Sequence, residues 1–304
     1  MIDHDANRNL KTYGKSFHWA RFFLHKNIGT PATSLYGFCR LLDDIADGEL
    51  PGGTERLIDI DNQIKGVALI KEKQVDQFLK LADKYKISFE TVHQLILGLL
   101  DDQSNNLTLS QTDLLKYSYR VAGTVGLMMV PILGARDKQA EPFAIDLGIA
   151  MQLTNIGRDL LEDAFLGRRY IPASWCQGIT PAEIINIAAD PGERERRGVL
   201  MRSIDRLLLL AESYYKSGLV GLTYLPLRSH LSIGVAAFVY RAIGEQLRRE
   251  RFEWWRGRQI VGVYGKLAAS ARFMPWLRLR LNNLPKHDGS LHRGLEEFPG
   301  ININ

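Results

Sequence analysis

The sequence predicts an all-α protein, and three observations support this prediction. Apolar residues recur mainly at spacings of three and four along the 304 residues. Alternating runs of β-branched residues bounded by hairpin turns are scarce. Prolines and capping residues mark several helix starts. No linker, low-complexity tract or repeat of fixed period interrupts the chain, so we expect one helical domain over residues 1–285 and a loose C-terminal tail over residues 286–304.

The first helix start predicted from the sequence lies at Thr30 and Pro31. A threonine followed by proline fits an N-cap with proline at the first helical position, and the helix should run to about Asp47. Gly48 then favours its end.

Further helix starts follow along the chain. Ser110 and Thr180 each stand three residues before an acidic side chain, which is the spacing of a capping box. Prolines stand where three more long helices should begin, at Pro142, Pro191 and Pro226.

Composition and charge limit the functional classes. Hydrophobic residues make up 45% and charged residues 24%, which is typical of a globular chain. Cys39 and Cys176 lie far apart without a metal-binding spacing, so neither a disulfide framework nor a zinc site is expected. The N-terminus lacks the apolar core of a signal peptide, and the longest apolar stretch, residues 121–135, is shorter than the roughly 18 residues of a spanning helix. We therefore expect a cytoplasmic protein whose net charge of +5 favours anionic partners.

An acidic motif closes the first predicted helix. On a helix, Asp43 and Asp47 lie one turn apart on the same face, whereas Asp44 points about 100° away. Like charges at this spacing destabilise a helix, and the negative end of the helix dipole adds to the repulsion. The arrangement therefore favours a bound cation.

A second acidic motif follows about a hundred residues later. Asn155, Asp159 and Asp163 recur every four residues, which would place all three on one face of a continuous helix. Carboxylate and amide oxygens suit Mg²⁺, which typically bridges protein carboxylates and substrate phosphates, and Arg158 supplies a phosphate donor. Apolar residues along positions 147–161 predict a largely buried helix, so these carboxylates need a counter-charge. One such pair alone is more often a solvated helix face; two together predict a metal–diphosphate site.

Around these motifs, the chain resembles the squalene and phytoene synthase family from about Lys15 to Phe252. The matching segments occur in consistent order, at residues 15–17, 36–47, 117–126, 152–163, 167–172 and 240–243. The resemblance implies a single-domain, isoprenoid synthase-type helical bundle with a central cavity.

The family pattern, carried onto this chain, implies roles for individual side chains. Five would hold two or three Mg²⁺ ions with the diphosphates, namely Asp43, Asp47, Asn155, Asp159 and Asp163. Catalytic roles are implied for Asp43, Asp47, Asp159, Asp163 and Tyr117. Contacts to the diphosphate or the prenyl chains are implied for Tyr13, Gly14, Lys15, Ser16, Phe17, Tyr36, Arg40, Val121, Val125, Gly126, Gln152, Arg158 and Tyr240.

The chain departs from the family pattern in places. Gly157 takes the place of a common leucine, and Leu160-Leu161 replaces the usual Val-Gly. A family arginine expected shortly after Phe252 aligns with a glycine, which leaves Arg256 or Arg258 to take its role.

The reaction implied by the resemblance is a prenyl transfer. Two geranylgeranyl diphosphate molecules would join head to head to give phytoene, through a cyclopropyl diphosphate intermediate and with release of diphosphate. The region from Leu225 to Gly244 resembles bacterial phytoene synthases, which implies that NADPH is not needed. A squalene or dehydrosqualene synthase using farnesyl diphosphate is the alternative, and cyclisation of a single terpene substrate or a non-catalytic helical binding protein are more distant ones.

The C-terminal part suggests a further partner. Arginines are interleaved with aromatic residues from Arg248 to Arg258, as in nucleic-acid binders, but Glu250 and Glu253 dilute the positive charge. Residues 260–281 then mix apolar side chains with four cationic ones. We expect this part to bind an anionic membrane surface, which would make the protein peripheral on the inner face of the membrane. We expect no nucleic acid partner.

Overall fold

The computed structural model describes residues 24–67, 72–103, 107–258, 261–275 and 284–302, which form helices and loops without a strand among them. The all-α prediction is confirmed. The helices, in order, are α3 (Lys26–Ala46), α4 (Gly53–Ile64), α5 (Lys73–Tyr85), α6 (Phe89–Gln103), α7 (Gln111–Ser118), the π-helical turn η1 (Tyr119–Gly123), α8 (Thr124–Ile132), η2 (Lys138–Ala140), α9 (Glu141–Arg158), α10 (Leu160–Phe165), α11 (Pro181–Ala189), α12 (Arg194–Gly221), η3 (Leu222–Tyr224), α13 (Leu227–Arg249), η4 (Trp254–Arg256), α14 (Val263–Phe273) and η6 (Gly289–His292).

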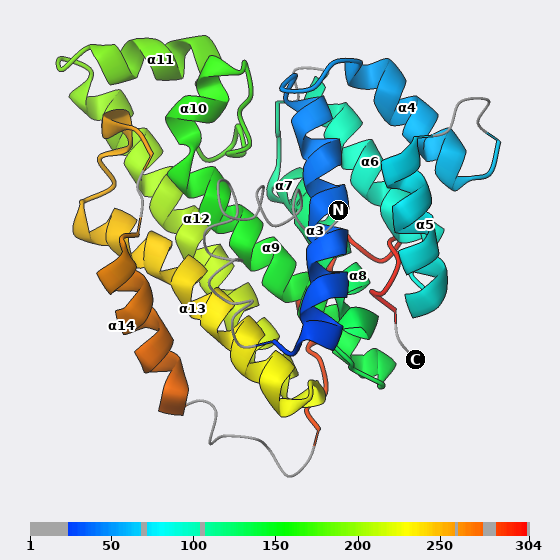
Figure 1. Ribbon diagram of the computed structural model, residues 1–304. Helices are drawn as coiled ribbons and strands as arrows, with labels where there is room; N and C mark the ends of the chain where they lie inside the picture. Colours follow the sequence, from blue (N-terminus) through cyan, green and yellow to red (C-terminus); the bar gives the residue numbers. More distant parts are fainter. Residues whose placement is uncertain (1–23, 68–71, 104–106, 259–260, 276–283, 303–304) are drawn as a thin grey trace.

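The helix α9 lies near the middle of the bundle (Figure 1). It packs against α12 and α13 on one side and against α8 and η1 on the other. α3 packs against α4, α5, α6 and α8. The two helices that carry the acidic motifs, α3 and α9, therefore belong to opposite halves of one bundle.

Two glycines allow the close approach of η1 and α8 to α9. A Cβ atom on Gly148 would overlap the carbonyl oxygen of Ala122, and one on Gly126 would overlap that of Ala144. Backbone atoms cannot move aside as a flexible side chain can, so only glycine fits at either position. The small residues of this region thus serve tight helix packing.

Several predicted helix starts are confirmed. Ser110 and Thr180 form complete capping boxes at the starts of α7 and α11. Pro142 lies in the first turn of α9, and Pro226 is the N-cap of α13. α12 begins three residues after Pro191, at Arg194.

Two helix predictions were wrong in detail. α3 begins at Lys26 rather than at Pro31, so Thr30 is not its N-cap and Pro31 lies inside the helix, where it cannot donate a backbone hydrogen bond. The second motif is not one continuous helix. Asp159 has φ −103° and ψ 17°, in the sparsely populated bridge region, and this residue separates α9 from α10.

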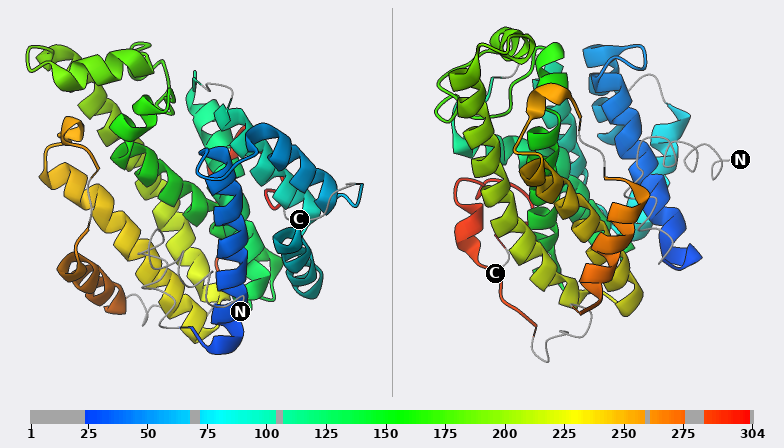
Figure 2. Two further views of the ribbon diagram at one scale, coloured as in Figure 1. Left: turned by 45° about the horizontal axis from the view of Figure 1, so that its top comes forward. Right: turned by 90° about the vertical axis from the view of Figure 1, so that its left-hand side faces the viewer.

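The C-terminal tail predicted for residues 286–304 is packed rather than loose over its described residues, 286–302. Leu295 and Phe298 are buried, and the Phe298 ring stacks on Tyr119 with the ring centroids 4.5 Å apart. In the right-hand view of Figure 2 this segment, in red, runs beside α12, and the Tyr214 hydroxyl of α12 donates to the Leu291 carbonyl at 2.6 Å. The segment carries no periodic apolar pattern, because individual side chains rather than a helix face attach it.

The longest apolar stretch behaves as a packed element. Residues 121–135 form the end of η1, α8 and the turn after it, and α8 lies against α6 and α9. Among the described helices, none has both the length and the apolar content needed to cross a membrane.

Candidate active site

A cavity of about 310 Å³ lies between the two halves of the bundle. Its polar lining residues come from the C-terminal halves of α3 and α9 and from α13, whereas the lining from α8, the start of α9 and α12 is apolar. The cavity therefore has a polar end and an apolar end. It brings together nine of the residues predicted from the sequence, namely Tyr36, Arg40, Asp43, Val121, Val125, Gly126, Gln152, Asn155 and Tyr240.

The first acidic motif sits at the C-terminal end of α3. Arg40, one turn earlier, lies with Nη1 3.2 Å from Asp43 and Nη2 2.6 Å from Asp44. Asp47 is the C-cap of the helix. Asp43 faces the cavity, while Asp44 serves as a partner for Arg40, in agreement with its predicted position off the ligand face.

The second acidic motif spans the break between α9 and α10. The Asp159 carboxylate receives two arginines, with Arg158 Nε at 2.6 Å and Arg258 Nε at 3.1 Å. Asp163 follows one turn later in α10. The sequence did not decide whether Arg256 or Arg258 takes the role of the family arginine. In the structure Arg258 contacts Asp159, whereas Arg256 pairs with Glu253.

Arg168 joins the two motifs. Its Nη1 atom lies 2.8 Å from Asp47 Oδ1, and its Nε donates to the backbone carbonyl of Asp102 at 3.3 Å. The ends of α3 and α6 and the loop after α10 therefore converge on one guanidinium.

Asp102 belongs to the site but was missed from the sequence. It accepts hydrogen bonds from the hydroxyls of Tyr117, at 3.0 Å, and Tyr170, at 2.7 Å, and the two rings stack with centroids 4.5 Å apart. Tyr117 is thus placed beneath the acidic end of the site and is not among the residues that line the cavity. The adjacent acidic pair at the C-terminal end of α6, Asp101 and Asp102, resembles the pair in α3 and was the available indication.

The carboxyl groups of this region are electrostatically strained. Asp43 lines the cavity with its side chain half exposed, and desolvation together with the charge of Asp47 raises its pKa to about 7. Burial raises the pKa of Asp102 to about 6, although the two tyrosine hydroxyls act in the opposite direction. Burial and the neighbouring Asp159 charge raise the pKa of Asp163 well above its ordinary value. A bound cation nearby would favour the charged form of all three carboxyl groups and so offset the cost of their burial and mutual repulsion.

The donor set fits Mg²⁺. Within the described part of the chain, the Asn155 Oδ1 atom is buried and has no hydrogen-bond partner, while its Nδ2 donates to Gln152 at 3.3 Å. A buried carbonyl oxygen without a donor costs free energy that a hard cation would recover. Asp43 and Asn155 line the same cavity, and Asp47 is tied to the adjoining loop by Arg168. The predicted residues Tyr13, Gly14, Lys15, Ser16 and Phe17 lie outside the described residues.

The chain is similar to known proteins over most of its length. The family model for squalene/phytoene synthase matches residues 10–263. A 15-cis-phytoene synthase from Enterobacter agglomerans is 35% identical, over 85% of this chain and 90% of its own. A 15-cis-phytoene synthase from Pantoea ananas is 35% identical over 88% and 89%, and a phytoene synthase from Rhodobacter capsulatus is 30% identical over 94% and 89%.

Solved structures of the same fold include two at lower identity. The crystal structure of a dehydrosqualene synthase with ligand superposes with a TM-score of 0.79, at 24% identity over 91% of this chain and 96% of that one. The squalene synthase HpnC from Alicyclobacillus acidocaldarius gives 0.66, at 20% identity over 83% and 94%. These likenesses confirm the helical fold predicted from the sequence. With the family model and the relatives, they establish that the chain belongs to the squalene/phytoene synthase family of prenyl-transferring enzymes.

Proposed function

We propose that this enzyme joins two molecules of geranylgeranyl diphosphate head to head to give phytoene, through a cyclopropyl diphosphate intermediate and with release of diphosphate. The observation that carries the proposal is the cavity itself, which is lined at one end by Asp43, Arg40 and polar side chains and is apolar over the remainder. A prenyl diphosphate has the same division into charged head and apolar chain. The names of the similar bacterial enzymes support the choice of product.

The polar end would hold the diphosphates. Mg²⁺ would bind Asp43, Asp47, Asn155, Asp159 and Asp163 and neutralise charge on the departing diphosphate. The nearby guanidiniums are each paired with a carboxylate in this structure, Arg40 with Asp43 and Arg158 with Asp159. These side chains are pre-positioned to donate hydrogen bonds to phosphate oxygens once the carboxylates turn to the cation.

The apolar end would shelter the carbocation. Ionisation leaves positive charge on carbon, and water there would quench it before the second chain reacts. The Tyr36 ring, which lines the cavity two turns before Asp43 on α3, could stabilise this charge through its π face by about 2 kcal/mol when desolvated. Desolvation, with Tyr240 and Asp43 nearby, raises the pKa of the Tyr36 hydroxyl, so the phenol stays protonated and is a poor nucleophile.

Product analysis tests the proposal. The purified enzyme is incubated with Mg²⁺ and either geranylgeranyl or farnesyl diphosphate, with and without NADPH. We expect phytoene from the twenty-carbon substrate regardless of NADPH. Squalene formed from farnesyl diphosphate only when NADPH is present would instead assign the chain to squalene synthesis, and a cyclic product from one substrate molecule would assign it to terpene cyclisation.

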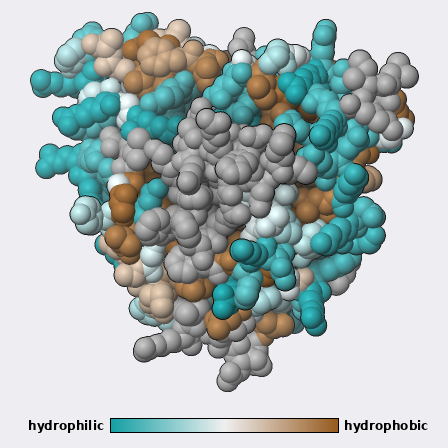
Figure 3. Space-filling model, in the orientation of Figure 1, coloured by the Kyte–Doolittle hydropathy of each residue, from teal (hydrophilic) through white to brown (hydrophobic). Residues whose placement is uncertain are grey.

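We also propose that α14 rests on an anionic membrane surface. Ala269 and Phe273 of α14 are buried, whereas Tyr264 and Leu267 of the same helix are exposed. Arg272, also on α14, pairs with Glu245. Hydrophobic residues are visible in Figure 3 at the lower left, where α14 lies in Figure 1. An exposed apolar stripe with cationic neighbours suits an interfacial helix. Flotation with anionic liposomes should capture the protein at low salt, and Tyr264→Ser with Leu267→Ser should abolish the capture; an unchanged capture would refute the role of α14.

A further inference from the structure

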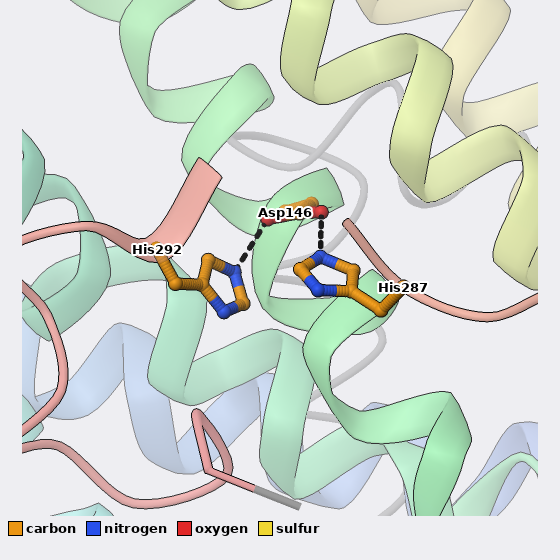
Figure 4. A group of neighbouring side chains, drawn as sticks. All are labelled: Asp146, His287 and His292. Atoms are coloured by element: carbon orange, nitrogen blue, oxygen red, sulfur yellow. Dashed lines mark hydrogen bonds and ion pairs between the residues drawn. The ribbon is translucent and has the colours of Figure 1, made fainter. Parts of the chain in front are cut away.

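Three side chains outside the acidic site form a buried cluster. Asp146 lies on α9, and His287 and His292 belong to the C-terminal segment 284–302, which we call the strap. Each oxygen of the Asp146 carboxylate lies 2.7 Å from the Nε2 atom of one histidine (Figure 4). Asp146 is 0% exposed and His292 is 3% exposed. The strap is thereby fastened to the same helix that carries Asn155.

The geometry favours direct hydrogen bonds over a bound metal ion. In the described part of the chain, Nδ1 of His292 is buried without a hydrogen-bond partner. A neutral ring with its proton on Nε2 leaves only a lone pair at Nδ1 and donates to Asp146. A ring that bound a metal through Nε2 would instead carry a buried, unpaired N–H at Nδ1, where metal-binding histidines normally have an acceptor.

The hydrogen bonds between Asp146 and the two histidines lie on the face of α9 that points away from the cavity. Asp146 precedes Asn155 by nine residues, which places the two on opposite faces of α9. Gly148 and Ala144, which line the cavity, also lie on the face away from Asp146. Asp146 therefore makes no contact with the cavity and acts on it only through what the strap touches.

The strap reaches the cavity through Phe143. The His287 ring packs against Phe143 edge-on, with ring centroids 5.0 Å apart, and Tyr224 lies on Phe143 at 5.8 Å. Tyr224 is itself tied to the strap, because its hydroxyl donates to the Pro285 carbonyl at 2.6 Å. Phe143 lines the cavity and stands twelve residues, about 18 Å, along α9 from Asn155. It therefore belongs to the far, apolar end.

We propose that the strap sets the depth of the cavity: Asp146 and His287 are positioning residues that fix the Phe143 ring, and Phe143 limits the length of the prenyl chain. The proposal rests on the proposed function for its substrate class. A prenyl chain whose head lies near Asn155 extends towards Phe143, so a ring held from behind by His287 stops longer chains. A ring without that support can turn into the vacated space and admit them.

The variant His287→Ala tests this role. Initial rates are measured with the twenty-carbon diphosphate and with its twenty-five-carbon homologue, each alone. Because one methylene of fit changes discrimination about tenfold or more, we expect the ratio of kcat/KM for the longer to the shorter chain to rise by about tenfold. Phe143→Leu should shift the ratio in the same direction. His93→Ala is the matched control, since it breaks a histidine–aspartate pair of 2.9 Å between α6 and α4, and should leave the ratio unchanged.

Backbone hydrogen exchange tests the fastening independently of turnover. In folded His287→Ala and in the isosteric Asp146→Asn, amides of residues 141–147 and of the strap should exchange about tenfold faster, and those of α3 should not. An unchanged chain-length ratio in folded His287→Ala, exchange that rises evenly over the whole chain, or one equivalent of zinc in the purified protein would each overturn the proposal. Failure of the wild-type enzyme to use any prenyl diphosphate would refute the proposed function instead, and the exchange result would still decide whether the strap is fastened as described.

Discussion

The Arg168 guanidinium lies 2.8 Å from the Asp47 carboxylate, and this ion pair joins the segments that carry the two acidic motifs. Arg168 is only 11% exposed and also donates to the Asp102 backbone. Asp47, Asp102 and Asp163 all lie close enough to interact with it electrostatically. The residue thus supplies the positive charge around which the acidic end of the cavity is assembled.

Arg168→Gln should destabilise the protein and lower activity together. The substitution removes the counter-charge of a half-buried cluster, and loss of a hydrogen bond between charged groups costs about 2 kcal/mol. Urea denaturation and steady-state rates measure the two effects. Arg196→Gln, which breaks a more exposed pair with Glu183, should destabilise the protein much less. Equal effects of the two substitutions would argue against a special role for Arg168.

Substitution of the proposed metal ligands should remove activity while leaving the fold intact. Asp43→Asn and Asp163→Asn keep the side-chain shape but lose the charge, and we expect rates to fall by about 100-fold or more. The exposed Asp83→Asn is the control and should act as the wild type does. Circular dichroism verifies folding. Near-normal turnover in Asp43→Asn would contradict the site.

The raised pKa of Asp43 predicts a pH dependence of stability. Its pKa is about 7 in the folded protein and about 4 in the unfolded chain, so between these values the folded state holds a proton that the unfolded state has released. The free energy of unfolding of the metal-free protein should therefore fall as the pH rises from 4 to 7. Urea titrations in EDTA at several pH values measure the fall, which should be smaller in Asp43→Asn. Identical slopes would show that Asp43 is not strained.

Arg258 and Arg256 offer a direct comparison of two nearby arginines. Arg258 reaches Asp159 at 3.1 Å, whereas Arg256 pairs with Glu253 and is 67% exposed. We expect Arg258→Gln to raise KM for the diphosphate substrate by about tenfold, the effect of one lost charge-assisted hydrogen bond, and Arg256→Gln to change it little. The reverse ranking would assign the diphosphate contact to Arg256.

Tyr117→Phe separates a structural role from a catalytic one. The hydroxyl donates to buried Asp102, and losing one of two such bonds should cost about 2 kcal/mol in urea denaturation. If the hydroxyl serves only Asp102, the rate should stay within about tenfold of wild type, and Tyr170→Phe should have a similar effect. A rate loss of several orders of magnitude in Tyr117→Phe alone would support the catalytic role that the family resemblance implies.

Local patterns in the sequence predicted what is determined locally. The capping boxes at Ser110 and Thr180 depend on residues three apart, and both form. The face shared by Asp43 and Asp47 follows from helix geometry alone. The meeting of Tyr240 with Gln152 and Asn155 around one cavity came from the family resemblance, since Tyr240 is more than eighty residues away along the chain and has no local relation to the other two.

What escaped prediction depends on distant contacts. Asp102 has no local feature that distinguishes it from other acidic residues at helix ends. Its role follows from the hydrogen bonds that Tyr117 and Tyr170 donate to it in the folded protein. The strap has no periodicity, and its attachment depends on the match of His287 and His292 to Asp146, more than a hundred residues away. The helix break at Asp159 was likewise not predicted, because the residue at the break is neither proline nor glycine.

The most direct test of the proposed function is to identify the product formed from geranylgeranyl diphosphate and Mg²⁺ without any nicotinamide cofactor. We expect phytoene and free diphosphate in a ratio of one to two, from wild-type enzyme and not from Asp43→Asn. A product that forms equally well in Asp43→Asn, or the absence of phytoene while farnesyl diphosphate is converted to squalene with NADPH, would contradict the proposed function.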